Sequence, residues 1–171
     1  MARRIEEIQL DDCAHHGMYA MLGVSAEEGR LLDLHQNKSR FLYRYAGSLT
    51  EKSVVACFQA LDPTAGPLVL LNTRAERPKT VQVDCLLGHE AFEIKWRDAT
   101  TDGDHVAKER MKVQIIADAG YVPVKLAFFE PQRAQARKIQ ASLAQLFADQ
   151  GGHYYAGQAA WDYVHQRTGV D

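Results

Sequence analysis

The segment from Thr80 to Arg97 constrains the fold most, because it has the pattern of two β-strands joined by a tight turn. Apolar and polar residues alternate along TVQVDCLLGHEAFEIKWR, as they do in strands with one buried face. Between the two strands, Gly88-His89 is a two-residue loop that begins with glycine, which is typical of a type II′ hairpin turn. The sequence therefore predicts an antiparallel hairpin at the centre of the fold.

The register of this hairpin determines which side chains share a face. A turn at Gly88-His89 places Asp84 opposite Glu93, and directly opposed residues project from the same side of a sheet. Lys95, two residues after Glu93, projects there as well. Two carboxylates and a lysine on one face predict a divalent-cation site, because hard cations bind carboxylate oxygens. The predicted polar face consists of Gln82, Asp84, Glu93 and Lys95, and the predicted apolar face of Val83, Cys85, Phe92, Ile94 and Trp96.

The composition is that of a globular chain. Its 171 residues can bury one sizeable core, and a net charge of -2 argues against a strongly basic, non-specific nucleic-acid binder. The 3 cysteines are widely spaced and form no Cys-x-x-Cys pair, which favours a reducing compartment. No run approaches the roughly 18 apolar residues of a membrane span. We expect a cytoplasmic protein that does not cross a membrane.

The order of predicted elements indicates an α/β protein with a small mixed sheet, in which the central hairpin is flanked by helices. We expect a single domain over residues 1–171, with a helical N-terminal subregion (1–46), a core (50–149) and a C-terminal helix (150–171). Ser25 is a candidate N-cap of the first helix, and Ser48 or Thr50 of the second. Besides the hairpin, the predicted elements are helices over 50–61, 105–119, 131–149 and 157–166, strands over 68–71 and 121–129, and a turn-rich loop over 98–104.

The polar face of the hairpin has the groups that phosphodiester hydrolysis requires. Asp84 and Glu93 could hold a hard cation such as Mg²⁺, which polarises a phosphoryl oxygen and helps to ionise water. Lys95 could position that water or stabilise the developing negative charge. An unperturbed lysine is protonated at neutral pH, so we favour the charge-stabilising role over that of general base. The alternative is a solvated sheet face with an ordinary ion pair.

These residues resemble the motif of the PD-(D/E)xK nucleases, in which an acid on one strand is followed by Glu-x-Lys on the next. Asp84 and Glu93-Ile94-Lys95 match it, and Val83 replaces the usual proline before the aspartate. Two longer runs, EIKWRDATTDGDH at 93–105 and GYVPVKLAFFEPQRAQARKIQ at 120–140, are similar to the ApaLI-like restriction endonucleases. The detailed resemblance covers about residues 80–140 and implies a restriction-endonuclease-like core.

The resemblance implies a type II restriction endonuclease, a Mg²⁺-dependent homodimer that cleaves double-stranded DNA at a specific site and leaves 5′-phosphate ends. Asp84, Glu93 and the backbone carbonyl of Ile94 would bind the metal, and Lys95 would act on the attacking water. An acid from a helix before the sheet often completes the metal site in this superfamily. Glu51 is the candidate for that role here, with a first-turn acid of its helix as the alternative.

Basic residues after the motif are candidates for contacts to the DNA backbone. They are Arg97, His105, Lys108 and Lys112, and the alternative is that they are ordinary surface charges. Two other functions remain open: a repair or junction nuclease with the same fold, and a non-catalytic DNA-binding module. A hydrolase of small phosphoesters is a further alternative. The sequence does not predict the recognition site.

Overall fold

A computed structural model describes residues 8, 16–97 and 103–170. The chain forms two compact units, residues 1–48 and 49–171, and each is described here by itself. Helix α3 (Ala26–Leu61) contributes residues to both units. The predicted helix boundary at residues 46–50 is wrong, because α3 passes through Ser48 and Thr50 without a break. Gly47 alone costs a helix only about 1 kcal/mol, which does not require an interruption. The single-domain organisation with its three subregions stays a prediction.

The first unit contains α2 (His16–Met21) and the N-terminal part of α3. Ser25 caps α3 as predicted: its Oγ accepts a hydrogen bond from the Glu28 N–H at 3.2 Å, and its own N–H donates to the Glu28 carboxylate at 3.0 Å. The Tyr19 hydroxyl donates to Asp33 at 2.7 Å. A Cβ at Gly29 would approach the Tyr19 ring to 2.7 Å, so this glycine lets the ring pack closely against α3.

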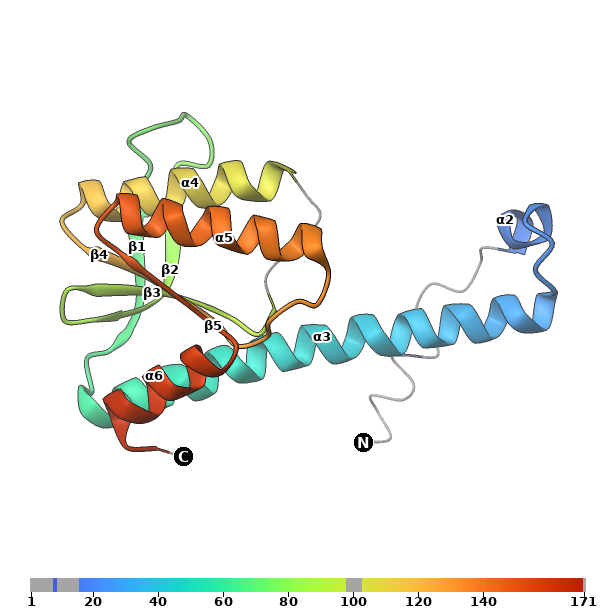
Figure 1. The fold of residues 1–171 in the computed structure, drawn as a ribbon, viewed down its shortest axis with the longest axis horizontal. Helices are drawn as coiled ribbons and strands as arrows, with labels where there is room; N and C mark the ends of the chain where they lie inside the picture. The colour runs from blue at the N-terminus through green and yellow to red at the C-terminus, as the bar shows by residue number, and fades with distance from the viewer. Residues whose placement is uncertain (1–7, 9–15, 98–102, 171) are drawn as a thin grey trace. The chain divides into compact units, whose positions relative to one another are not determined.

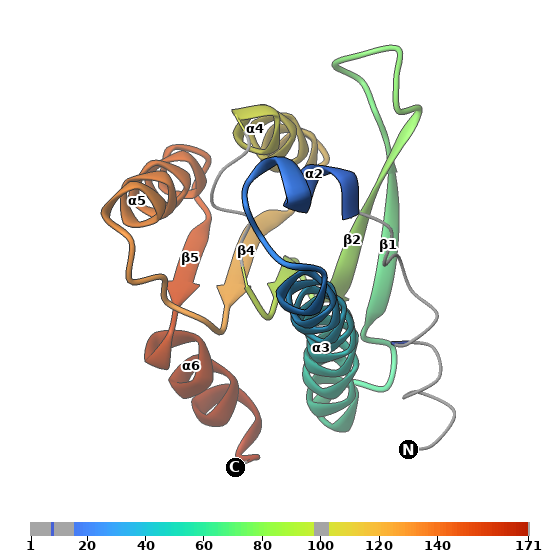
Figure 2. The same cartoon turned by 90° about the vertical axis from the view of Figure 1, so that its right-hand side faces the viewer.

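The second unit is built on a five-stranded mixed sheet with strand order β1-β2-β3-β4-β5. Strands β1, β2 and β3 are antiparallel to one another, while β4 and β5 continue the sheet in parallel. Helices α4 and α5 cover one face, and α6 and the end of α3 cover the other (Figures 1 and 2). The predicted α/β class, with helices flanking a mixed sheet, is confirmed. The bounds are β1 (Gly66–Leu71), β2 (Thr80–Leu87), β3 (Glu90–Lys95), α4 (Gly103–Asp118), β4 (Val122–Ala127), α5 (Ala134–Asp149), β5 (His153–Ala156) and α6 (Gln158–Thr168).

Each sheet face has its own hydrophobic core. Toward α3 and α6, Phe58 and Phe92 lie at the centre, with ring centroids 4.6 Å apart, and Val164 of α6 joins them. Toward α4 and α5, smaller clusters form around Val113 and Ile116 of α4. The largest apolar cluster therefore anchors α3 and α6, while the α4 side is less completely apolar.

The predicted hairpin turn is confirmed. Leu87 pairs with Glu90 and Cys85 with Phe92, so Gly88 and His89 form the turn. Gly88 has φ +59°, and none of the described non-glycine residues has a positive φ, as a type II′ turn requires at these two positions.

Strand β5 is absent from the prediction, which treated Gly151-Gly152 only as the end of a helix. A Cβ at Gly152 would lie 2.2 Å from the backbone oxygen of Pro123, so the chain enters β5 in direct contact with β4. Four residues are too few to show a strand period, and their pairing with β4 comes from distant parts of the chain. The predicted loop over 98–104 falls mostly outside the described residues.

Candidate active site

An irregularity in β2 shapes the centre of the site. Gly66 pairs with Leu86, but Leu68 pairs with Val83, so β2 carries one more residue than β1 across this interval. Such a bulge redirects the side chains that follow it. Val83 accordingly packs with Ile116 on the α4 side, while Cys85 belongs to the cluster on the α3 side. The prediction that Val83 shares a face with Cys85 is wrong for this reason.

Asp84 lies within this bulged interval, and the structure brings it to the other two motif residues. Its Oδ2 atom accepts a hydrogen bond from the Ile94 N–H at 2.8 Å and lies 3.3 Å from the Lys95 Nζ. The same Nζ forms an ion pair with Oε1 of Glu93. Asp84, Glu93 and Lys95 therefore form one connected group, as the hairpin register predicted.

A second lysine completes this group. Lys112 of α4 forms an ion pair with Oε2 of Glu93, so each oxygen of this carboxylate contacts a different ammonium group. The sequence interpretation proposed Lys112 only as a contact to DNA. The sequence does contain a pattern that places Lys112 on the side of the helix toward the sheet. Lys112 lies four residues before Ile116 and three after Glu109, which is the spacing of residues on one helical face.

The electrostatics follow from burial and these ion pairs. Burial by itself raises the pKa of Glu93, but the charges of Lys95 and Lys112 outweigh it and lower that pKa. Burial lowers the pKa of Lys95, but the Glu93 and Asp84 carboxylates outweigh it and raise that pKa. In this arrangement Lys95 keeps its proton at neutral pH, which favours a charge-stabilising role over that of a base.

Glu51 is half-buried on α3 and shares the electrostatic field of this group. Its pKa is raised, first by burial and then by the charge of Asp84, while Lys95 opposes the shift. Because α3 begins at Ala26, Glu51 is not a first-turn acid, and that alternative is wrong. Its role as a third metal ligand stays a prediction.

The donor atoms suit a hard divalent cation in kind, because Asp84 and Glu93 offer only carboxylate oxygens. Among the described residues, no three His, Cys, Asp or Glu side chains are already arranged to hold a metal ion. The lysine ammonium groups instead supply the positive charge next to both carboxylates. Metal binding by Asp84, Glu93 and the Ile94 carbonyl stays a prediction. It requires the ammonium groups of Lys95 and Lys112 to move away from the carboxylate oxygens.

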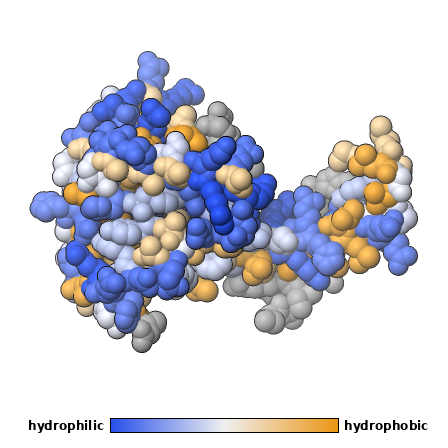
Figure 3. All heavy atoms as spheres, viewed as in Figure 1, coloured by the Kyte–Doolittle hydropathy of each residue, from blue (hydrophilic) through white to orange (hydrophobic). Residues whose placement is uncertain are grey.

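The remaining candidate DNA contacts are Arg97, Lys108 and His105. Arg97 is exposed, with its guanidinium carbon 5.3 Å from the centre of the Phe129 ring, and Lys108 is exposed on α4. The side chain of His105 lies outside the described residues. The surface of the second unit that faces the viewer in Figure 3 is mainly hydrophilic, with small, scattered hydrophobic areas.

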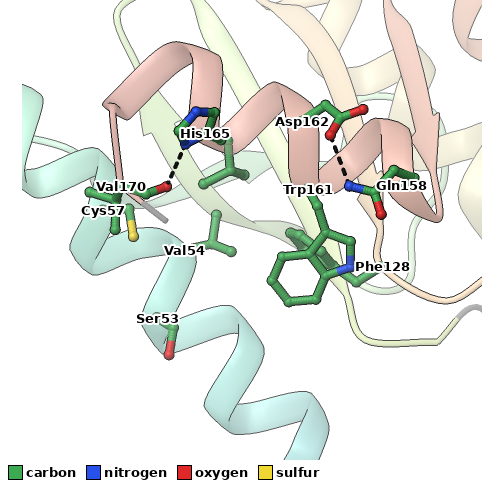
Figure 4. A pocket seen from close by; sticks show the side chains of 10 residues that line it. Ser53, Val54, Cys57, Phe128, Gln158, Trp161, Asp162, His165 and Val170 are labelled. Carbon is green, nitrogen blue, oxygen red and sulfur yellow. Dashed lines mark hydrogen bonds between the residues drawn. The ribbon is translucent and has the colours of Figure 1, made fainter.

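The second unit also has a cavity of about 540 Å³ between α3 and α6, shown in Figure 4. Trp161 and Phe128 form one wall in edge-to-face contact, with ring centroids 4.4 Å apart. Its one carboxylate, Asp162, accepts a hydrogen bond from Gln158 at 2.9 Å. Because the described lining of this cavity has neither paired carboxylates nor a lysine, the Asp84 group is the better candidate for a catalytic centre.

Comparison with known proteins identifies the family of the chain. Residues 1–171, the whole chain, match the family model described as ApaLI-like restriction endonuclease. No match was found among curated proteins or among solved structures. Within the described residues, no helix is both long and apolar enough to cross a membrane. The resemblance inferred from residues 80–140 is thereby confirmed over the full length, and the chain belongs to the ApaLI-like restriction endonuclease family, whose members are nucleases.

Proposed function

We propose that this protein is a type II restriction endonuclease that hydrolyses phosphodiester bonds of duplex DNA with Mg²⁺ and leaves 5′-phosphate ends. The observation that carries the proposal is the convergence of Asp84, Glu93 and Lys95, with the Lys95 Nζ in contact with both carboxylates. Family membership supports the same function for the whole chain.

In this proposal Asp84 and Glu93 hold the cation, together with the carbonyl of Ile94, and Glu51 is the candidate for a third carboxylate ligand. When bound, Mg²⁺ supplies Lewis-acid polarisation of the phosphoryl oxygen. Lys95 orients the attacking water and stabilises the negative charge that develops on the phosphate. The Ile94 N–H, 2.8 Å from Asp84 Oδ2, fixes the orientation of that carboxylate.

We further propose that two copies act together, because a two-fold symmetric DNA site is best matched by a two-fold symmetric dimer. Arg97 and Lys108, both exposed, are proposed contacts to the DNA backbone, and His105 is a third. Cys57 and Cys85 are both free thiols, in keeping with the proposed cytoplasmic location.

Incubation of the protein with phage DNA and Mg²⁺ tests this function. We expect discrete fragments that religate readily, because DNA ligase requires 5′-phosphate ends. EDTA should abolish cleavage, and Lys95→Ala should lower its rate by about 100-fold or more. Lys138→Ala, which removes an exposed lysine of α5, is the matched control and should cleave as the parent does.

Other products would identify the alternatives. Smeared or structure-dependent fragments would indicate a repair or junction nuclease. Salt-dependent DNA binding without cleavage in any metal would indicate a non-catalytic module. Sedimentation of the protein with and without a cleavable duplex tests the dimer separately.

A further inference from the structure

The Glu93 carboxylate has more positive charge around it than an ordinary ion pair provides. Lys95 contacts Oε1 and Lys112 contacts Oε2, and Lys95 also reaches Asp84. The Glu93 side chain is 6% exposed and that of Lys112 is 18% exposed, so both are largely removed from water. Lys95 is shared with Asp84, so Lys112 completes the neutralisation of Glu93. Burying such an ion pair recovers little more than the cost of its desolvation, so net stability alone explains Lys112 poorly.

The position of Lys112 is fixed by its own helix. One turn earlier, the Glu109 carboxylate accepts a hydrogen bond from Lys125 of β4 at 2.8 Å, and both side chains are buried. Lys125 pairs with Glu93 across the β3–β4 ladder. One turn later, Ile116 packs against Val83 and Ala91. Contacts on both sides therefore hold α4 so that Lys112 meets Glu93.

The charges of the group indicate what Lys112 does when a cation is present. Asp84 and Glu93 contribute two negative charges, and Lys95 and Lys112 contribute two positive ones. A divalent cation bound by the two carboxylates makes this group strongly positive and releases the ammonium groups from their oxygens. The surplus positive charge suits a phosphodiester, which carries one negative charge.

We propose that Lys112 is a second cationic catalytic residue, which neutralises Glu93 in the cation-free protein and binds a non-bridging oxygen of the scissile phosphate when the carboxylates hold the cation. This inference rests on the proposed nuclease function. It differs from a general DNA contact because Lys112 acts at the bond that breaks. It also gives α4 a direct part in catalysis, in addition to Lys95 on β3.

The test compares Lys112→Met with Lys112→Arg, which keeps a cation. Single-turnover cleavage should fall about 100-fold in Lys112→Met and recover substantially in Lys112→Arg. Calorimetric titration of the DNA-free protein provides a second readout. Mg²⁺ should bind Lys112→Met at least as tightly as the parent, because a competing cation has been removed. Lys138→Met is the matched control and should leave both measurements unchanged.

The possible failures can be told apart. If the parent cleaves and Lys112→Met cleaves equally fast, the inference is wrong while the proposed function stands. If Lys112→Met binds Mg²⁺ more weakly and Lys112→Arg fails equally, Lys112 is only structural and the inference is wrong again. If the parent does not cleave DNA under any condition while its fold is intact, the proposed function and this inference both fail. Thermal melting in EDTA establishes that each variant is folded.

Discussion

The two faces of the sheet differ in what they bury, although the same strands form both. On the side of α3 and α6, Phe92 and Ile94 of β3 lie in a large apolar cluster. On the side of α4, the residue between them, Glu93, is buried against two lysines. Apolar burial stabilises the fold directly, whereas burying charges recovers little more than the cost of their desolvation. The comparison indicates that the larger apolar cluster on one face lets the other face keep buried charges, which we propose serve catalysis.

The largest loss of stability is expected from a substitution that leaves a cavity in the apolar cluster on the side of α3 and α6. Phe92→Ala removes a fully buried ring that contacts Phe58 and should lower the free energy of unfolding by about 3–5 kcal/mol. Urea denaturation measures this change. Leu71→Ala, at an exposed position of β1, is the control and should stay within about 0.5 kcal/mol of the parent. Equal losses in the two variants would contradict the stabilising role of the apolar cluster around Phe92.

A smaller loss of stability is expected from removing a buried charge on the side of α4. Lys125→Met leaves Glu109 buried without its lysine and should destabilise the fold by about 3 kcal/mol. The double variant Lys125→Met with Glu109→Leu should recover most of that loss, because neither charge then remains buried. Chemical denaturation of the two single variants and the double variant gives the coupling between them. If the double variant is no more stable than Lys125→Met, this pair contributes net stability and the comparison needs revision.

The smallest effect concerns the pH dependence of stability. Burial and the charge of Asp84 raise the pKa of Glu51, so the folded protein holds this proton more tightly than the unfolded chain does. Stability from that proton is present at low pH and is lost as the pH rises through the raised pKa. Glu51→Gln removes this loss. In EDTA, the melting temperature of Glu51→Gln minus that of the parent should therefore increase from pH 4 to pH 7. A difference that stays constant over this range would contradict the prediction.

Local sequence was sufficient for the hairpin and for the convergence of Asp84, Glu93 and Lys95. The register follows from alternation and one glycine turn, and both depend on neighbours in the chain. The N-cap of α3 at Ser25 is equally local. The helix break expected near Ser48 was wrong because capping residues only favour a helix end and do not impose one. In each correct case, the decisive interaction joins residues that are close in sequence.

Features that depend on distant contacts were not predictable in the same way. The bulge in β2 is defined only by its pairing with β1. Strand β5 forms because it pairs with the free edge of β4. Lys112 is intermediate, since its helical face was visible in the sequence but its partner across the sheet was not. The proposed third ligand, Glu51, lies on α3, and its approach to Asp84 depends on how that helix packs rather than on spacing within the hairpin.

The extra residue in β2 also affects how distant relatives of this chain should be aligned. In a relative without the bulge, the pairing of β1 with β2 would be displaced by one residue on one side of the interval from Val83 to Leu86, whereas the pairing of β2 with β3 beside the turn would be unchanged. Sequence alignments of such proteins are therefore better anchored on the hairpin turn than on β1.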